Sequence, residues 1–320
     1  MTEQTTPSHG PGRAEPIEVA KVTRAITWVS VLVALVLMVS KLFVFMLTGS
    51  VSLLASFADS SLDFFASITA FFAVRYAAEP ADEEHRFGHG KAESFASLFQ
   101  ALLVAISAAL VAREAVARLL HPQAISHGNL ALAVMVLSIA LTLGLVWLQE
   151  KAIKKSGSLA IAGDQAHYKA DLLANISVIV GVALATFGGF GMADALVGFG
   201  IALWLLYTAW KVAQNALDQM MDRELPEAER KLIIKTVRTV KGVYSVHELR
   251  TRASGSYIHM QFHLDLDPQQ TLAEAHKIVV EVERLLLETW PAADILIHPD
   301  PKGEAEPHGI RHFRGKSEPS

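Results

Sequence analysis

The sequence predicts an α-helical membrane protein with six transmembrane helices, followed by a C-terminal cytoplasmic α+β domain. The chain of 320 residues is 52% hydrophobic and only 19% charged, whereas soluble domains carry about a quarter charged residues. Its long uncharged stretches all lie in the first two thirds of the sequence, and polar residues become frequent after about Asp222. These observations indicate a membrane-embedded part and a smaller water-soluble part.

Six stretches are apolar and long enough to cross a bilayer as helices. A spanning helix needs about 20 mostly apolar residues. The predicted spans lie near residues 24–47, 51–75, 93–118, 129–149, 158–186 and 193–215. The segments between them include Thr48-Gly49-Ser50 and Gly188-Gly189, which are typical of turns.

Lys and Arg are distributed unevenly between the two sides of these spans. They occur before the first span and in the loops between spans two and three and between spans four and five, but not around 48–50 or 187–192. The positive-inside rule therefore places both termini in the cytoplasm, and we expect the membrane to be a bacterial inner membrane. Arg113 and Arg118, near the outer end of the third span, do not fit this orientation.

The predicted domain organisation has four parts. We expect a disordered cytoplasmic tail at 1–20, the transmembrane domain at 21–219, a cytoplasmic α+β domain at 220–300 and a disordered tail at 301–320. The net charge of −4 provides no basic field that would attract nucleic acid. The absence of cysteine excludes disulfides, thiolate metal sites and cysteine nucleophiles. The phosphate-loop pattern G-x-x-x-x-G-K-[ST] does not occur in the sequence, so the sequence gives no sign of an ATP-driven motor.

The soluble part predicts the element order α-β-β-α-β. The expected elements are a helix at 226–240, strands at 243–252 and 256–267, a helix at 272–289 and a short strand at 294–298. The second strand alternates apolar residues such as Phe262 and Leu264 with polar ones such as His263, the pattern of a half-buried strand. We place the turn between the two strands at Ala253-Ser254-Gly255. This order suits a small, open-faced, metallochaperone-like α+β sandwich.

Ionisable side chains inside a span are costly, so each one is a candidate functional residue. The second span carries Asp59 and Asp63, and the fifth carries His167 and Asp171. The i,i+4 spacing places each pair on one helix face, and both pairs lie ~15–17 Å deep at 1.5 Å of rise per residue. That depth is near the midplane of a ~30 Å core. Three carboxylates and one imidazole suit Zn²⁺ and tolerate Fe²⁺ or Cd²⁺.

The same residues are open to a less specific interpretation. A buried ion-pair network with Lys41 or Lys169 as counter-ion would also neutralise these carboxylates. Asp164, one turn before His167, could guide cations, but we favour a solvated structural role for it. Asp194 is expected to cap the sixth span.

Three motifs together resemble the cation diffusion facilitator family, in particular its ferrous-iron and zinc efflux pump branch. They are the D-x-x-x-D pair of span two, the sequence HYKAD at 167–171 in span five, and the loop PADEEHRFGHGKAES at 80–94. The resemblance covers about residues 20–300. It implies a homodimer that exchanges cytoplasmic divalent metal for protons by alternating access, with Asp59, Asp63, His167 and Asp171 as the transport site.

The resemblance also implies a second, looser metal site in the loop between spans two and three. Its residues are Asp82, His85 and His89, which one turn of helix could bring together around an ion. The alternative interpretation is a solvated polar loop without a bound ion. Lys91 and Asp222 match an inter-helix ion pair of the family, and the alternative for them is a surface salt bridge worth less than about 1 kcal/mol.

In the soluble part, the resemblance implies a two-metal site that is completed by the dimer partner. The residues that match its ligands are His247, His263, His276, His298 and Asp300. His259 matches no ligand, and we interpret it as a surface histidine. Pro299 stands between His298 and Asp300, where several relatives have Gln, so the geometry of one ligand could differ here.

The predicted function is therefore a divalent metal cation/proton antiporter that exports Zn²⁺, with Fe²⁺ or Cd²⁺ as further cargoes, and not an enzyme. The alternative is an enzyme, a membrane-embedded metal-dependent hydrolase, but such an enzyme needs an open metal position and a nearby base. A passive channel would use the same residues, although pores favour weak, multiple sites. The sequence leaves the preferred metal and the proton stoichiometry open.

Overall fold

The computed structural model describes residues 11–48, 51–120, 129–188 and 193–303. The chain divides into two units, and each is described here by itself. The helical unit consists of residues up to Arg223 together with Ala253–Ile258, and the α+β unit consists of Glu224–Arg252 and the residues from His259 onward. Most of the two tails that we expect to be disordered lies outside the described residues, namely 1–10 and 304–320. The same holds for the predicted turn residues 49–50 and 189.

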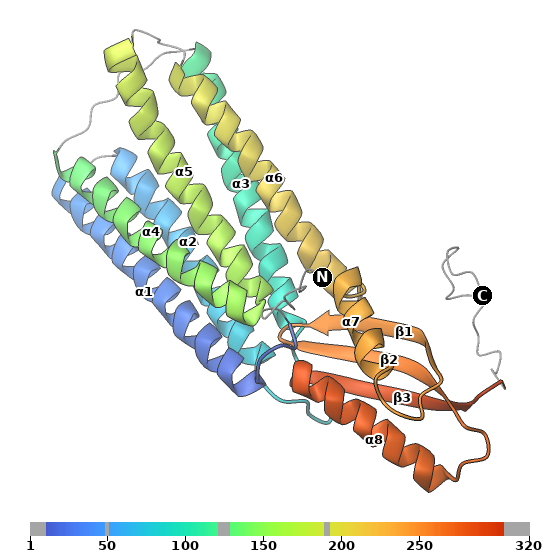
Figure 1. Ribbon diagram of the computed structural model, residues 1–320. Helices are drawn as coiled ribbons and strands as arrows, with labels where there is room; N and C mark the ends of the chain where they lie inside the picture. The colour runs from blue at the N-terminus through green and yellow to red at the C-terminus, as the bar shows by residue number, and fades with distance from the viewer. Residues whose placement is uncertain (1–10, 49–50, 121–128, 189–192, 304–320) are drawn as a thin grey trace. The chain divides into compact units, whose positions relative to one another are not determined.

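Long helices build the helical unit (Figure 1). They are α1 (Pro16–Thr48), α2 (Val51–Ala77), α3 (Ala92–Leu120), α4 (Asn129–Ser156), α5 (Leu159–Gly188) and α6 (Ala193–Met220). Helix α1 packs against α2 and α4, while α5 packs against α2, α3, α4 and α6. This arrangement brings α5 into contact with the other element that carries paired ionisable residues, α2.

The predicted spans agree with these helices in number and order, but not at every end. Helix α1 already begins at Pro16, so residues 16–20 of the expected disordered tail are helical. Proline suits this position because the first backbone N–H groups of a helix have no intrahelical acceptor. Helices α4 and α6 also continue past the predicted spans, to Ser156 and Met220.

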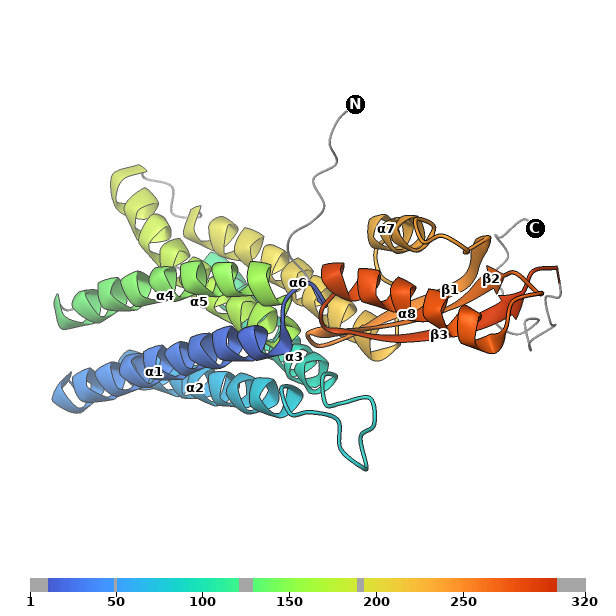
Figure 2. The same ribbon diagram turned by 60° about the horizontal axis from the view of Figure 1, so that its bottom comes forward.

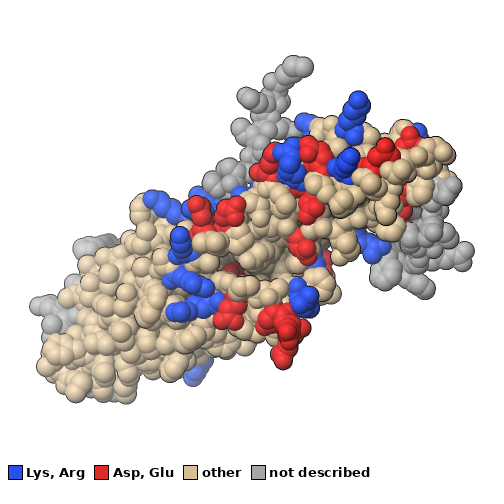
Figure 3. Space-filling model, turned by 90° about the horizontal axis from the view of Figure 1, so that it is seen from below, with Lys and Arg blue, Asp and Glu red and all other residues tan. Residues whose placement is uncertain are grey.

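Five of the described helices, α1, α2, α3, α4 and α6, are long and apolar enough to cross a membrane. The described side chains of α5 include Asp164, Lys169 and Asp171, which reduce its mean apolarity. Large apolar side chains such as Trp28, Phe43 and Leu110 are exposed on the outside of the unit. In the space-filling view, uncharged side chains cover most of the helical unit, and charged ones gather toward one end of it (Figure 3). These are the properties of a multi-pass membrane domain.

The soluble part has the predicted order α-β-β-α-β (Figure 2). Its elements are α7 (Glu227–Val237), β1 (Ser245–Ser254), β2 (Tyr257–Leu266), α8 (Leu272–Thr289) and β3 (Ala293–Pro301). The strands form a sheet in the order β1-β2-β3, and α8 packs against β3 and α7. The apolar residues of β2 are buried with Trp290 and Leu286, as the alternating pattern predicts.

Two boundaries in this domain differ from the prediction. The hairpin turn consists of Gly255 and Ser256 rather than residues 253–255, and Gly255 adopts a positive φ of 60° that glycine tolerates without strain. Strand β3 extends to Pro301 instead of ending at residue 298. The extension matters because it places Asp300 on the sheet beside residues of β2.

Candidate metal centre

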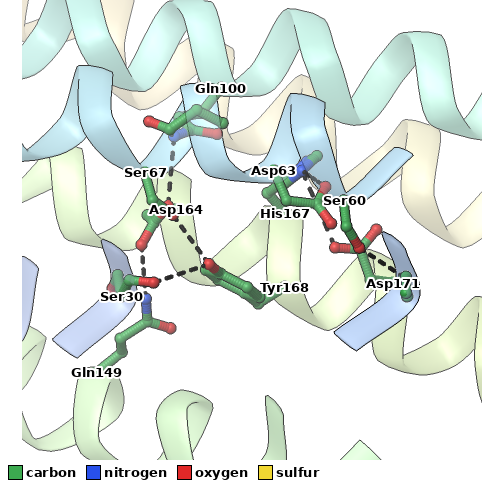
Figure 4. A network of polar contacts seen from close by, with 12 residues as sticks. Ser30, Ser60, Asp63, Ser67, Gln100, Gln149, Asp164, His167, Tyr168 and Asp171 are labelled. Carbon is green, nitrogen blue, oxygen red and sulfur yellow. Dashed lines mark hydrogen bonds and ion pairs between the residues drawn. The ribbon is translucent and has the colours of Figure 1, made fainter. Parts of the chain in front are cut away.

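Helices α2 and α5 bring three of the four predicted transport-site residues together (Figure 4). His167 Nε2 lies 2.7 Å from Asp63 Oδ1 and 3.9 Å from Asp171 Oδ2. One potential ligand atom from each residue lies within 4.8 Å of the others. Asp63 is 5% exposed and His167 is 3% exposed. We refer to Asp63, His167 and Asp171 as the intramembrane cluster.

Asp59 is not part of this cluster. It lies one turn before Asp63 on α2 and is exposed in this chain. Lys41 lies close enough to Asp59 to interact with its charge and donates a hydrogen bond to Ser60 Oγ at 2.6 Å. For Asp59, the interpretation as an ion pair with Lys41 is therefore still supported. Lys169, the other candidate counter-ion, instead donates a hydrogen bond to Gln165 Oε1 at 2.8 Å.

Two atoms of the intramembrane cluster lack hydrogen bonds within the described part of the chain. Asp171 Oδ2 and His167 Nδ1 are both buried without such a partner. A buried carboxylate oxygen without a donor is costly, and a divalent cation would satisfy Asp171 in a way that no neighbouring side chain does here. The cluster therefore has the ligand chemistry and the unmet polar demand of a cation site.

Asp164 differs from its sequence-based interpretation as a solvated residue. It is only 1% exposed. Its Oδ1 accepts hydrogen bonds from Ser67 Oγ at 3.0 Å and Gln100 Nε2 at 3.4 Å, and its Oδ2 accepts one from Gln149 Nε2 at 2.8 Å. The prediction was wrong because helical periodicity does not show that α2, α3 and α4 all present polar side chains to this face of α5.

The loop between α2 and α3 brings Asp82, His85 and His89 together. His85 Nδ1 lies 3.3 Å from Asp82 Oδ1, and His89 Nε2 lies 3.2 Å from Asp82 Oδ2. The loop is not helical, so a helical turn is not what brings these residues together. Asp82 instead accepts the backbone N–H groups of His85 and Glu84 at 2.6 and 2.9 Å. The His85 N–H is the main reason that the pKa of Asp82 is lowered.

All three strands of the sheet contribute to a third group of ligands. Asp300 Oδ2 lies 2.8 Å from His263 Nδ1 and 3.3 Å from His247 Nε2, and Asp300 Oδ1 lies 3.1 Å from His298 Nε2. His247 comes from β1, His263 from β2, and His298 and Asp300 from β3. Pro299 therefore does not prevent the convergence of its two neighbours. We refer to these four residues as the sheet cluster.

Other residues of the soluble part differ from the sequence-based interpretation. His276 is exposed on α8 and is not among the grouped ligands of the described residues. His259 is buried, not on the surface, and its Nδ1 lies 2.9 Å from Asp294 Oδ2. Sequence reasoning missed Glu248, whose Oε2 lies 3.9 Å from His263 Nε2. Glu248 has a positive φ of 51° within β1, and no sequence pattern signals such a conformation for Glu.

The predicted pair of Lys91 and Asp222 is present. Lys91 Nζ lies 2.9 Å from Asp222 Oδ1 and also donates to the Met220 carbonyl at 3.3 Å. Asp222 has a positive φ of 57° just after α6 ends. The pair thus connects the start of α3 with the end of α6.

A bundle of apolar helices with carboxylate and imidazole ligands buried between two of them defines a membrane transporter of metal cations. Residues 27–221 match the cation efflux transmembrane domain, and residues 225–302 match the cation efflux protein cytoplasmic domain. The chain therefore belongs to the cation efflux family, the cation diffusion facilitators. It is a multi-pass membrane transporter that exports divalent metal cations, and it is not an enzyme.

Curated relatives match nearly the whole chain. The cation-efflux pump FieF of Yersinia enterocolitica is 40% identical over 282 residues, which cover 88% of this chain and 94% of the relative. FieF of Yersinia pestis is 41% identical over 268 residues, covering 84% and 89%. The zinc form of CzrB, a solved structure, is 31% identical and covers 27% of this chain and 98% of its own, with a TM-score of 0.24. Since the curated relatives are cation-efflux pumps, they do not support the hydrolase alternative.

Proposed function

We propose that this transporter exports Zn²⁺ from the cytoplasm in exchange for protons, with Fe²⁺ and Cd²⁺ as alternative cargoes. The observation that carries the proposal is the buried 2.7 Å contact between His167 Nε2 and Asp63 Oδ1 beside Asp171. Imidazole nitrogen and carboxylate oxygen are ordinary Zn²⁺ ligands, and they also bind Fe²⁺. The relatives' name, cation-efflux pump, supports the direction of transport.

The four transport-site residues have distinct tasks in this proposal. Asp63, His167 and Asp171 bind the ion first because they already lie together. Asp59, one turn away on α2, supplies the fourth ligand when it leaves the vicinity of Lys41. Four ligands complete the tetrahedral shell that Zn²⁺ prefers.

The same contact explains why metal and protons compete. At 2.7 Å, a hydrogen must lie between His167 Nε2 and Asp63 Oδ1, because two bare acceptors would repel each other. A metal ion can bind Nε2 only when that hydrogen leaves, since ligands bind metal in their deprotonated forms. Protons that return to the cluster from the outer face would then reset the transporter for another cycle of alternating access.

Asp82, His85 and His89, in the loop between α2 and α3, are proposed as a second, weaker cation site, because they also bring carboxylate and imidazole ligands together. Asp82→Ala combined with His85→Ala is expected to lower the bound Zn²⁺ by one ion per protomer, because only His89 remains. Zinc titration of the purified protein measures this, and Glu83→Ala, which changes an exposed neighbouring carboxylate, is the control. Unchanged zinc stoichiometry in the double variant would support the solvated-loop interpretation.

The sheet cluster is proposed to hold the soluble domains of a homodimer together through bound Zn²⁺. Its four residues converge on one protomer, while the exposed His276 is left to serve as a ligand for the partner's ion. Metal would offset the negative charge of Asp300, which is buried among three histidines. The domain boundary at 219, the cytoplasmic termini and the inner-membrane location belong to the same proposal.

His263→Ala combined with Asp300→Ala is expected to weaken dimerisation and to lower zinc flux partially. The variant removes two of the four residues of the sheet cluster, including the central Asp300, but leaves the intramembrane cluster intact. Sedimentation of the full-length protein with and without chelator measures the first effect, and zinc uptake into proteoliposomes measures the second. Dimerisation that is unaffected by chelator in the unmodified protein would contradict the proposed role of the sheet cluster.

Metal uptake into proteoliposomes tests the proposed cargo. Zn²⁺, Fe²⁺, Cd²⁺ and Mn²⁺ are compared at equal free concentration under the same pH gradient. We expect Zn²⁺, Fe²⁺ and Cd²⁺ to be transported faster than Mn²⁺, because the imidazole ligand favours the former ions over a metal suited to all-oxygen sites. Faster Mn²⁺ uptake would contradict the proposed cargo.

A further inference from the structure

A second buried polar network lies one helical turn from the intramembrane cluster, centred on Asp164 (Figure 4). Asp164 and His167 are three residues apart on α5, or ~4.5 Å along the helix axis. The side chains around Asp164 come from five helices: Ser30 from α1, Ser67 from α2, Gln100 from α3, Gln149 from α4 and Tyr168 from α5. All of them are neutral, so the described hydrogen-bond partners provide no counter-ion for a buried carboxylate.

The hydrogens of this network can be counted. Three contacts form a chain: Asp164 Oδ1 to Ser67 Oγ at 3.0 Å, Ser67 Oγ to Tyr168 Oη at 2.9 Å, and Tyr168 Oη to the Ser30 carbonyl at 3.2 Å. The two hydroxyl groups supply one hydrogen each, and the Ser30 carbonyl can only accept. With Asp164 ionised, two hydrogens must serve three contacts, so one contact has none.

A proton on Asp164 provides the missing hydrogen. Asp164 Oδ1 then donates to Ser67, Ser67 donates to Tyr168, and Tyr168 donates to the Ser30 carbonyl. The Gln149 amide still donates to Asp164 Oδ2 at 2.8 Å in either state. When Asp164 is ionised, Ser67 reverses and donates to it. Tyr168 then has one hydrogen for its contacts with Ser67 and the Ser30 carbonyl, so turning the hydroxyl groups satisfies all three contacts only in the protonated form.

From this geometry we infer that Asp164 is a proton-binding site, separate from the intramembrane cluster, whose proton is released when a metal ion binds there. The inference deepens the proposed antiport and rests on it. Protonation adds one hydrogen to the carboxylate and removes its charge, while ionisation returns the proton to water. No metal coordination by Asp164 is involved.

The linkage to metal binding is electrostatic. The titratable groups that face Asp164 are Tyr168 of the hydrogen-bond chain and two residues of the cluster, His167 on α5 and Asp63 on α2. A divalent cation one turn away favours the ionised form of Asp164, and the loss of the cation favours the protonated form. One proton would therefore move opposite to each metal ion through Asp164, in addition to any carried by His167. The residues that face Asp164 from α1, α3 and α4 do not titrate, and they are Ser30, Gln100 and Gln149.

The test counts the protons that are released when Zn²⁺ binds to the full-length protein. The background carries Asp82→Ala, His85→Ala, His263→Ala and Asp300→Ala, which remove the other two metal sites. Calorimetry in buffers of different ionisation enthalpy, from about pH 5.5 to about pH 8, gives the number of protons released per Zn²⁺. Asp164→Asn, which keeps the shape but cannot ionise, is compared with the same background that retains Asp164.

We expect Asp164→Asn to release up to one proton fewer per Zn²⁺ within this range, and Zn²⁺ still to bind. Glu150→Gln is the matched control, because Glu150 is half-exposed, lies 3.7 Å from Lys169 and 3.5 Å from Lys154, and is the neighbour of Gln149. The control should leave the proton count unchanged. If Asp164→Asn does not fold, Ser67→Ala breaks the same chain and should shift the pH at which the extra proton is released.

The outcomes separate this inference from the proposed function. Equal proton release at every pH, by a folded Asp164→Asn variant, would overturn the role of Asp164 but leave the antiport through His167 standing. No proton release even with Asp164 present would overturn both. An infrared band of a protonated carboxyl group that disappears on zinc binding, and is absent in Asp164→Asn, would support the assignment independently.

Discussion

Asp63→Ala is expected to abolish zinc transport while the protein still folds and dimerises. Asp63 contributes the oxygen closest to His167 Nε2, at 2.7 Å. Loss of a residue that merely orients a metal ligand typically costs 10- to 100-fold in affinity or activity, so loss of a ligand should cost at least about 100-fold. Zinc uptake into proteoliposomes measures the effect.

Two further variants make this result interpretable. Asp63→Asn keeps the volume and one oxygen but removes the charge, and we expect it to be nearly as inactive as Asp63→Ala. Asp218→Ala removes an exposed aspartate that pairs with Arg223 outside the cluster, and it should transport zinc normally. Normal zinc flux by a folded Asp63→Ala variant would show that the intramembrane cluster is not the transport site.

Zinc affinity of the intramembrane cluster is expected to fall as the pH drops from about 7.5 to about 6. Each proton that competes with the metal lowers the affinity tenfold per pH unit while its group remains protonated in the free protein. One competing proton thus predicts a decrease of about 30-fold over this range, and two predict a larger one. The sign follows from the ligand chemistry, because His167 and the carboxylates bind metal only when deprotonated.

Calorimetric zinc titration of a variant with Asp82→Ala, His85→Ala, His263→Ala and Asp300→Ala measures this dependence at the intramembrane cluster. Buffers that differ in ionisation enthalpy report the protons released on binding. A constant affinity and zero proton release at every pH between these limits would leave antiport without a mechanism.

Most of the fold could be predicted because its determinants are local. A run of apolar residues long enough to cross a bilayer predicts a helix wherever it occurs, and the alternation in residues 256–267 predicts a strand. The ends of the helices were less predictable. Helix α1 begins at Pro16 because helical conformation continues into the polar segment that precedes its apolar part, and composition alone does not show where such a helix starts.

The candidate metal ligands were predictable where spacing was sufficient. Asp63, His167 and Asp171 follow from two i,i+4 pairs at matched depth, and the structure brings them together. Asp59 and Asp164 show the limit of that reasoning. The charge of Asp59 interacts with Lys41 in another helix, and the burial of Asp164 depends on side chains from four other helices. Contacts between distant segments have no local pattern in one sequence.

The soluble domain shows the same limit. The alternation along β2 correctly places His263 toward other polar residues, yet His259 is buried on the same strand beside Asp294. Glu248 approaches His263 because its backbone adopts a positive φ inside a strand. Neither feature follows from residue type or spacing, since both depend on how neighbouring strands pair and bend.

Zinc flux under an imposed pH gradient tests the central claim most directly. Proteoliposomes with an acidic lumen and neutral exterior are compared with vesicles that have no gradient, while a proton-sensitive dye reports the lumenal pH. The account predicts that the acidic lumen accelerates zinc uptake, that uptake is accompanied by proton efflux, and that a proton ionophore removes the acceleration. Zinc uptake that proceeds at the same rate with and without the gradient, and moves no protons, would contradict it and would identify a passive channel.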